Sequence, residues 1–155
     1  MDPLSIAASA AALAQTAGTL AIWLYELANK VKNADSKLSD LCKEVEQLTN
    51  LLMSVEKTVK QCQSQVLTLA HLDQHMWEQI NATLADCQSN IDGLNGLAIK
   101  LMSQYDPEAT GFGRLLKKPS LHFHFVVHKD AIQDYTTKIV KSNYAMQTTL
   151  AVVSV

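Results

Sequence analysis

Residues 38–69 read LSDLCKEVEQLTNLLMSVEKTVKQCQSQVLTL. Apolar side chains recur through this stretch in alternating steps of three and four residues, with Lys, Glu, Asp, Gln, Ser and Thr at most of the intervening positions. We call this row of side chains the first seam; its members are Leu38, Leu41, Val45, Leu48, Leu52, Val55, Val59, Cys62, Val66 and Leu69. The spacing predicts a long amphipathic helix that buries one face against other helices.

A second seam with the same spacing follows a short turn, in which Asp73 is placed to cap the next helix. Its members are Trp77, Ile80, Leu84, Cys87, Ile91, Leu94, Ala98, Leu101 and Tyr105. We expect this helix to end before Pro107, because proline disfavours a helical conformation in the residue ahead of it. Gly93 and Gly96 lie inside the helix and predict either a kink or a close crossing by a neighbouring helix. Because only a short connection separates the seams, we expect the two helices to be antiparallel neighbours.

The rest of the chain completes a helical domain. Residues 106–118 hold two glycines, a proline and a basic cluster and are expected to be irregular. Residues 121–128 alternate like a strand, but a lone strand would have no partner, so we expect a short helix or an extended packing segment there. A final helix is expected from residue 129, with apolar positions Ile132, Tyr135, Ile139, Met146, Leu150 and Val153. The sequence therefore predicts one all-α domain over residues 1–155, an antiparallel bundle of four to five helices with two long heptad-patterned central helices. The chain stops without a polar tail, so we expect either a natural continuation, with this as the N-terminal domain of a longer protein, or a short family member.

No charged side chain occurs from Pro3 to Tyr25. Asp2 and Pro3 form a good helix start, and the Ala- and Leu-rich run that follows favours helix. At about 1.5 Å per residue this helix reaches roughly 35 Å, enough to cross the apolar part of a bilayer. Many Ala, Ser and Thr residues dilute its apolar character, however, so burial inside a bundle is the first expectation and insertion into lipid a conditional second state. A secretory signal would begin with basic residues, whereas Asp2 is acidic.

Two sets of candidate residues follow from this helix. The candidate membrane-interacting residues are its larger apolar side chains, namely Leu4, Ile6, Leu13, Leu20, Ile22, Trp23 and Leu24. The second set is a ridge of small residues at intervals of four, Ala10, Ala14 and Gly18, which would permit a close helix contact.

Composition narrows the classes of partner and compartment. The chain has 155 residues, a net charge of −2 and no basic block, so we expect no nucleic-acid partner. Its three cysteines fall on or beside apolar stripes and are spaced unlike zinc ligands. They are expected to be reduced core thiols in an intracellular, reducing compartment.

No motif points to catalysis or to a cofactor. His122, His124 and His128 would share a face if their segment were a strand, but no fourth ligand lies nearby in sequence, so solvent-facing histidines are the default interpretation. The sequence has no phosphate-binding glycine loop, no nucleophile elbow and no evident carboxylate pair. We therefore expect neither an enzyme nor a bound cofactor, and elemental analysis for zinc would test the metal alternative.

Three segments carry a resemblance to a known family. The opening MDPLSIAASAAALAQTAGTLAIWLYEL, the helix KLSDLCKEVEQLTNLLMSVEKTV and the closing KDAIQDYTTKIVKSNYAMQTTLAVV resemble the fungal N-terminal domain of STAND (NLR-like) proteins, the HeLo-like group. The resemblance spans nearly the whole chain. It implies a helical bundle used in self/non-self recognition and regulated cell death, whose N-terminal helix is released to attack the membrane. Here that helix would be residues 3–25.

The resemblance and the uncharged helix together predict a conditional membrane-targeting cell-death effector. We expect a cytoplasmic protein that relocates to membrane lipid on activation, self-associates, and carries its sensor domain C-terminally. The alternative is a protein–protein interaction or oligomerisation module without membrane activity, in which the two seams bind like domains.

Overall fold

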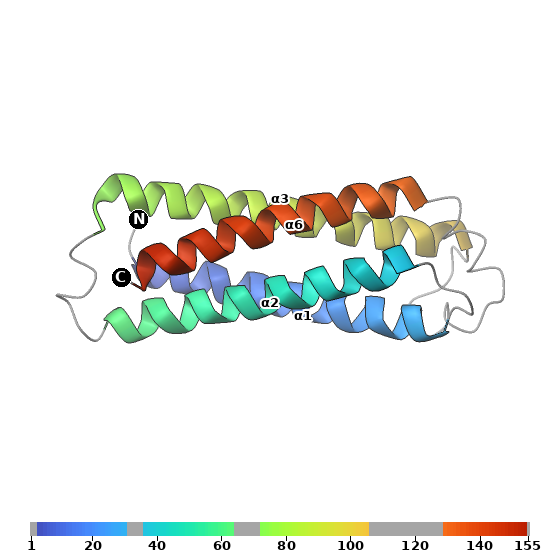
Figure 1. Ribbon diagram of the computed structural model, residues 1–155, viewed down its shortest axis with the longest axis horizontal. Coiled ribbons are helices and arrows are strands. Elements are labelled where there is room, and N and C mark those ends of the chain that lie inside the picture. Colours follow the sequence, from blue (N-terminus) through green and yellow to red (C-terminus); the bar gives the residue numbers. More distant parts are fainter. Residues whose placement is uncertain (1–2, 31–35, 64–71, 106–128, 155) are drawn as a thin grey trace.

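The computed structural model describes residues 3–30, 36–63, 72–105 and 129–154. Within these ranges the chain forms helices and no strand. The helices are α1 (Pro3–Lys30), α2 (Ser36–Gln63), α3 (Gln74–Tyr105) and α6 (Lys129–Val153). They lie lengthwise in one elongated bundle, with the start of α1 and the end of α6 at the same end (Figure 1). The predicted all-α helical bundle is confirmed.

Several helix ends lie where the sequence places them. Asp73 caps α3, since its Oδ1 accepts a hydrogen bond from the Met76 N–H at 2.9 Å. The Asp73 carbonyl also accepts the Trp77 N–H at 3.2 Å, which closes the first turn. At the other end α3 stops at Tyr105, two residues before Pro107, and the last helix starts at Lys129 as expected. The predictions for residues 106–128 lie outside the described residues.

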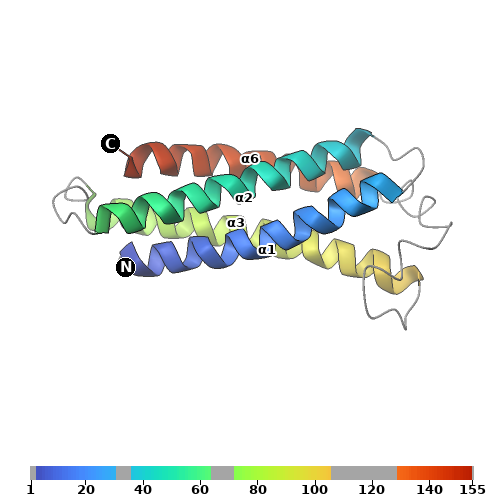
Figure 2. The same ribbon diagram turned by 90° about the horizontal axis from the view of Figure 1, so that it is seen from below.

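The helices pack in the cyclic order α1, α2, α6, α3 (Figures 1 and 2). Helices that follow one another along the chain run in opposite directions, but the neighbours α2 and α6 are parallel, as are α1 and α3. The prediction that the two seam helices are neighbours is therefore wrong, because α2 and α3 lie on a diagonal of the bundle. At about 3.3 Å per residue, residues 64–73 can span the roughly 14 Å of that diagonal.

The core is built from both seams. Every member of the first seam from Leu38 to Val59 is buried, and so is every member of the second from Trp77 to Ala98. Cys62 is half-buried, while Val66 and Leu69 and the side chains of Leu101 and Tyr105 lie outside the described part. The heptad register is thus confirmed over the described positions.

The three cysteines are free, and Cys42 and Cys87 are buried. Burial raises the pKa of the Cys87 thiol to about 11, partly offset by a hydrogen bond with Ser142. Burial also raises the pKa of Cys42, with a smaller contribution from the charge of Glu46. Both thiols therefore remain protonated at neutral pH and act as small apolar side chains.

Gly93 lies directly against the Tyr135 side chain of α6. A Cβ added there would lie 2.6 Å from the Oη and 2.9 Å from the Cε1 of Tyr135. A larger residue at this position would therefore require the end of the Tyr135 side chain to shift. Gly96 has no such neighbour within 4 Å of its Cβ position, so packing does not explain it.

Candidate functional site

The candidate site is α1, whose buried face combines small and large apolar side chains. The buried residues are Ile6, Ala7, Ala10, Leu13, Ala14, Ala17, Leu20 and Leu24. Half of them are alanines, and α1 makes its most extensive contacts with α2. Two residues of the small-residue ridge, Ala10 and Ala14, are buried. A Cβ on the third, Gly18, would lie 3.5 Å from Thr49 Cγ2, an ordinary contact distance, so the ridge lies against α2 at Gly18.

The candidate membrane-interacting residues divide between two faces of α1. Leu4 and Ile22 are 59% and 60% exposed, whereas Trp23 is partly buried against the core. The other four, Ile6, Leu13, Leu20 and Leu24, are buried. The structure thus leaves two of the seven residues open to solvent, and the buried four could reach lipid only after α1 leaves its neighbours.

Two threonines on the outer face of α1 bond to the backbone of their own helix. Thr16 Oγ1 donates to the Ala12 carbonyl and Thr19 Oγ1 to the Gln15 carbonyl, both at 3.1 Å. A hydroxyl that already has a partner is less costly to remove from water than a free one. Moving these two threonines from water to an apolar environment therefore costs less free energy than moving threonines with free hydroxyls.

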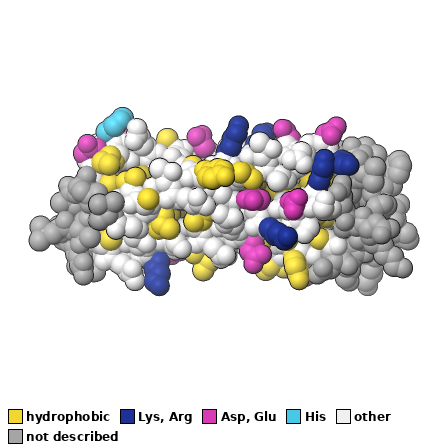
Figure 3. All heavy atoms as spheres, viewed as in Figure 1, with side chains coloured by type: hydrophobic (Ala, Val, Ile, Leu, Met, Phe, Trp, Pro, Cys, Tyr) yellow, Lys and Arg dark blue, Asp and Glu magenta, His cyan; other side chains and the backbone are white. Residues whose placement is uncertain are grey.

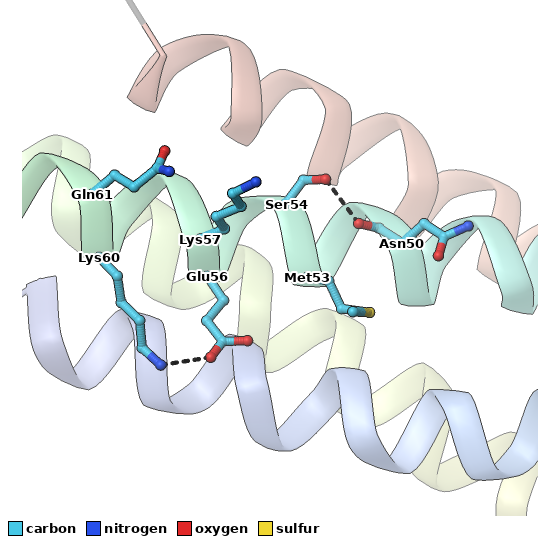
Figure 4. Close-up of a pocket in the computed structure, with 7 residues that line it drawn as sticks. All are labelled: Asn50, Met53, Ser54, Glu56, Lys57, Lys60 and Gln61. Carbon is cyan, nitrogen blue, oxygen red and sulfur yellow. Dashed lines mark hydrogen bonds and ion pairs between the residues drawn. The ribbon is translucent and has the colours of Figure 1, made fainter.

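Two exposed apolar side chains extend this surface beyond the predicted set. Tyr25 is 61% exposed near the end of α1, and Met53 is 54% exposed on the side of α2 that faces α1 (Figure 4). Met53 lies in the helix of the first seam but is not a seam member, so heptad spacing does not distinguish it from other surface positions. Tyr25 could have been found from its place next to Trp23, at the end of the uncharged run.

Length and composition alone make one described helix a candidate membrane span, residues 3–26 within α1. The same test is passed by core helices of soluble proteins and by N-terminal signal sequences, and 39% of the tested window is buried. The same segment thus packs partly inside the bundle and is long and apolar enough to span a membrane.

The surface over α2 and α6 has mixed charge. Acidic and basic side chains are interspersed on the face shown in Figure 3. Lys60 and Glu56 form an exposed ion pair at 2.8 Å, which contributes little to stability. This face therefore presents no strongly basic surface.

Two shallow grooves lie outside α1. One, of 590 Å³, follows the solvent side of α2 and is lined by Asn50, Met53, Ser54, Glu56, Lys57, Lys60 and Gln61 (Figure 4). The other, of 270 Å³, lies between α3 and α6, and Met76, Ile80 and Val152 are among its lining residues.

No metal-binding group of three or more His, Cys, Asp or Glu residues occurs in the described ranges. His122, His124 and His128, the histidines considered as ligands, lie outside these ranges. The buried thiols of Cys42 and Cys87 have raised pKa values, the opposite of what a nucleophilic cysteine needs.

Comparison with known proteins places the chain in a family. No curated protein and no solved structure matches it. Residues 1–153 match the family described as "Pigment biosynthesis cluster protein PigL N-terminal". The expected kinship with N-terminal domains of fungal proteins is confirmed at this level, whereas no NLR or HeLo family matches. Because the match covers almost the whole sequence, the chain belongs to the family of PigL-type N-terminal domains of fungal pigment-cluster proteins.

Proposed function

We propose that this domain is a conditional membrane-targeting effector, as in the cell-death domains of fungal NLR-like proteins, and that α1 leaves the bundle on activation to insert into lipid. The observation that carries the proposal is the absence of charge on every side of α1 from Pro3 to Tyr25, although its outer face is exposed to water. A helix that served only as a bundle component would ordinarily carry charged residues on that face. The resemblance to HeLo-like domains supports the same interpretation.

The energetics of α1 suit a two-state element. Burial of apolar surface stabilises by about 25 cal/mol per Å², so the alanines of the buried face contribute much less than leucines would. Leaving the bundle therefore costs less for α1 than for a helix with a full seam of large side chains. A charge at the centre of a membrane-spanning helix would cost about 2.5–3.5 kcal/mol, and α1 contains none there.

A small difference between the two states is what makes α1 switchable. When burial and insertion differ by only a few kcal/mol, self-association or a conformational change in an attached sensor is enough to shift the equilibrium. The domain would then be cytoplasmic at rest and bound to membrane lipid when activated.

A reversible cross-link between α1 and α2 tests the proposal. Because a Cβ at position 18 lies 3.5 Å from Thr49 Cγ2, the double variant Gly18→Cys with Thr49→Cys can form a disulfide. The half-buried Cys62 is replaced by Ser to prevent mispairing. The chain is oligomerised through an inducible tag after residue 155 and added to dye-loaded vesicles of phosphatidylcholine and phosphatidylserine. We expect no leakage from the oxidised protein and restored leakage after reduction.

The two single variants supply the matched control. Gly18→Cys alone and Thr49→Cys alone, each with Cys62→Ser, carry one of the two new thiols and cannot join α1 to α2. Each should cause the same leakage under oxidising and reducing conditions. Equal leakage from the oxidised and reduced 18–49 variant would rule out release of α1.

A non-membrane role as an interaction module is the second candidate. The exposed side chains of Leu4, Ile22 and Tyr25 on α1 could also meet a protein partner. The described seam residues are almost all buried within the bundle, so self-association of the folded domain would have to use outer faces such as this one. Light scattering that shows self-association, with no vesicle leakage in any form, would favour this role.

A further inference from the structure

Two adjacent polar residues of α6 are buried in the bundle and bond to different helices. Asn143 Nδ2 donates to the Glu44 carbonyl at 3.0 Å and to Glu44 Oε2 at 2.7 Å, both on α2. Asn90 Nδ2 on α3 donates to Ser142 Oγ at 2.9 Å. One level of α6 is thereby tied to both of its neighbours.

This arrangement is not the most stable way to fill the core. The Asn143 Oδ1 atom is buried and has no partner within the described residues. Turning the amide over would place that oxygen against two acceptors of Glu44, so the hydrogen bonds fix its orientation. A buried polar atom without a partner lowers stability, whereas an apolar side chain would simply pack. A pair retained at such a cost is better explained by specificity, as for the buried asparagines that fix helix register in coiled coils.

The specificity concerns which helices are neighbours. The apolar seams alone are compatible with α2 and α3 side by side, yet the structure has α6 between them. Glu44 on α2 and Asn90 on α3 face the two polar side chains of α6 from opposite sides. Neither of these ties involves α1, which packs against α2 through apolar surface and through a weak 3.6 Å hydrogen bond from the Cys42 thiol to the Ala21 carbonyl.

We propose that Ser142 and Asn143 form a polar clamp that holds α2, α6 and α3 together as a three-helix unit, which remains folded when α1 departs. If α1 leaves the bundle to insert into lipid, the clamp keeps the other three helices folded, and in that respect the inference rests on the proposed function. Its physical content, that α1 opens before the other three helices, can be tested without lipid.

Native-state hydrogen exchange on the complete chain provides the test. In the parent protein we expect amides in α1 to exchange at least tenfold faster than those in the centres of α2, α3 and α6. Asn143→Leu keeps a similar volume and removes the tie to α2. Because leucine can still pack there, the variant should change the order of opening and not the overall stability: the tenfold difference in exchange between α1 and α2 should disappear. Asn50→Leu, at an exposed position of α2, should leave the order unchanged.

A second variant covers the possibility that Asn143→Leu does not fold. Ser142→Ala removes only the tie to α3, and it should accelerate exchange in α3 and α6 relative to α2. Equal protection of all four helices in the parent, or an unchanged order in the variant that folds, would overturn the clamp. Vesicle leakage plays no part in this result, so a failure of membrane insertion would leave the clamp standing and would count only against the proposed function.

Discussion

At the scale of single residues, the distinguishing feature of this domain is what α1 lacks. Thr16 and Thr19 occupy exposed positions where a helix ordinarily carries Lys or Glu, and both bond to their own backbone. Exposed threonine side chains tolerate substitution with little loss of stability. They therefore allow membrane insertion to be tested without disturbing the fold.

We expect Thr16→Lys to reduce vesicle leakage on the order of a hundredfold, because Thr16 is exposed near the middle of residues 3–25 and a charge at the centre of an inserted helix costs about 2.5–3.5 kcal/mol. Its effect on the free energy of unfolding should stay within about 0.5 kcal/mol. Thr137→Lys is the matched control, since Thr137 is exposed on α6 and makes the same kind of bond, to the Gln133 carbonyl at 3.2 Å. Leakage that is the same for both variants would contradict insertion of α1. Leu20→Asp is a less selective variant, because Leu20 is only 2% exposed and the change would also unfold the bundle.

At the scale of the helices, heptad spacing predicted which face of each helix is buried but not which helix covers it. The steps of three and four residues locate Leu48 or Leu84 in the core whatever the neighbour, so the seams were predictable while the diagonal placement of α2 and α3 was not. The clamp was missed because Ser142 continues the step pattern between Ile139 and Met146 with a polar side chain. A polar residue at a seam position was the available signal.

The contact between Gly93 and the Tyr135 ring leads to a prediction. Gly93→Ala should lower the free energy of unfolding by about 1–3 kcal/mol, because the new methyl group meets the ring of Tyr135. Gly96→Ala should instead raise it by about 0.5–1 kcal/mol, since alanine favours helix and has open space there. Urea denaturation of both variants measures the difference. In a Tyr135→Ala background, Gly93→Ala should become neutral or stabilising, and a persistent loss would mean that the ring is not the obstacle.

At the scale of the whole molecule, α1 could be predicted as a helix but its two faces could not be told apart. Nearly every position of α1 is apolar or small, so its sequence lacks the polar stripe that reveals the solvent side of an ordinary amphipathic helix. Only the structure separates the exposed Leu4 and Ile22 from the buried Ile6 and Leu20. The sequence thus predicted the helix and its lack of charge, whereas which of its side chains face solvent became known only from the bundle.

Both seams contribute to one continuous core, so substitutions in either should destabilise the whole domain. Leu48→Ala and Leu84→Ala should each lower the free energy of unfolding by about 2–5 kcal/mol, because both side chains are buried. Lys43→Ala, at an exposed position of α2, should change it by no more than about 0.5 kcal/mol. Chemical denaturation followed by circular dichroism compares the three. A cost for Lys43→Ala equal to that of the leucine variants would mean that the buried face is misassigned.

The parallel pairing of α2 with α6 has a consequence for biosynthesis. Glu44 and Asn143, which join these helices, are separated by 99 residues, so their contact forms only after most of the chain has left the ribosome. Until then α1 and α2 can form a hairpin, but α3 and α6 do not yet bury the rest of their apolar surface. A nascent chain in that condition is most exposed to premature capture by a bilayer or a chaperone. The time needed to translate α6 therefore sets how long the apolar surface of α1 and α2 stays exposed during synthesis.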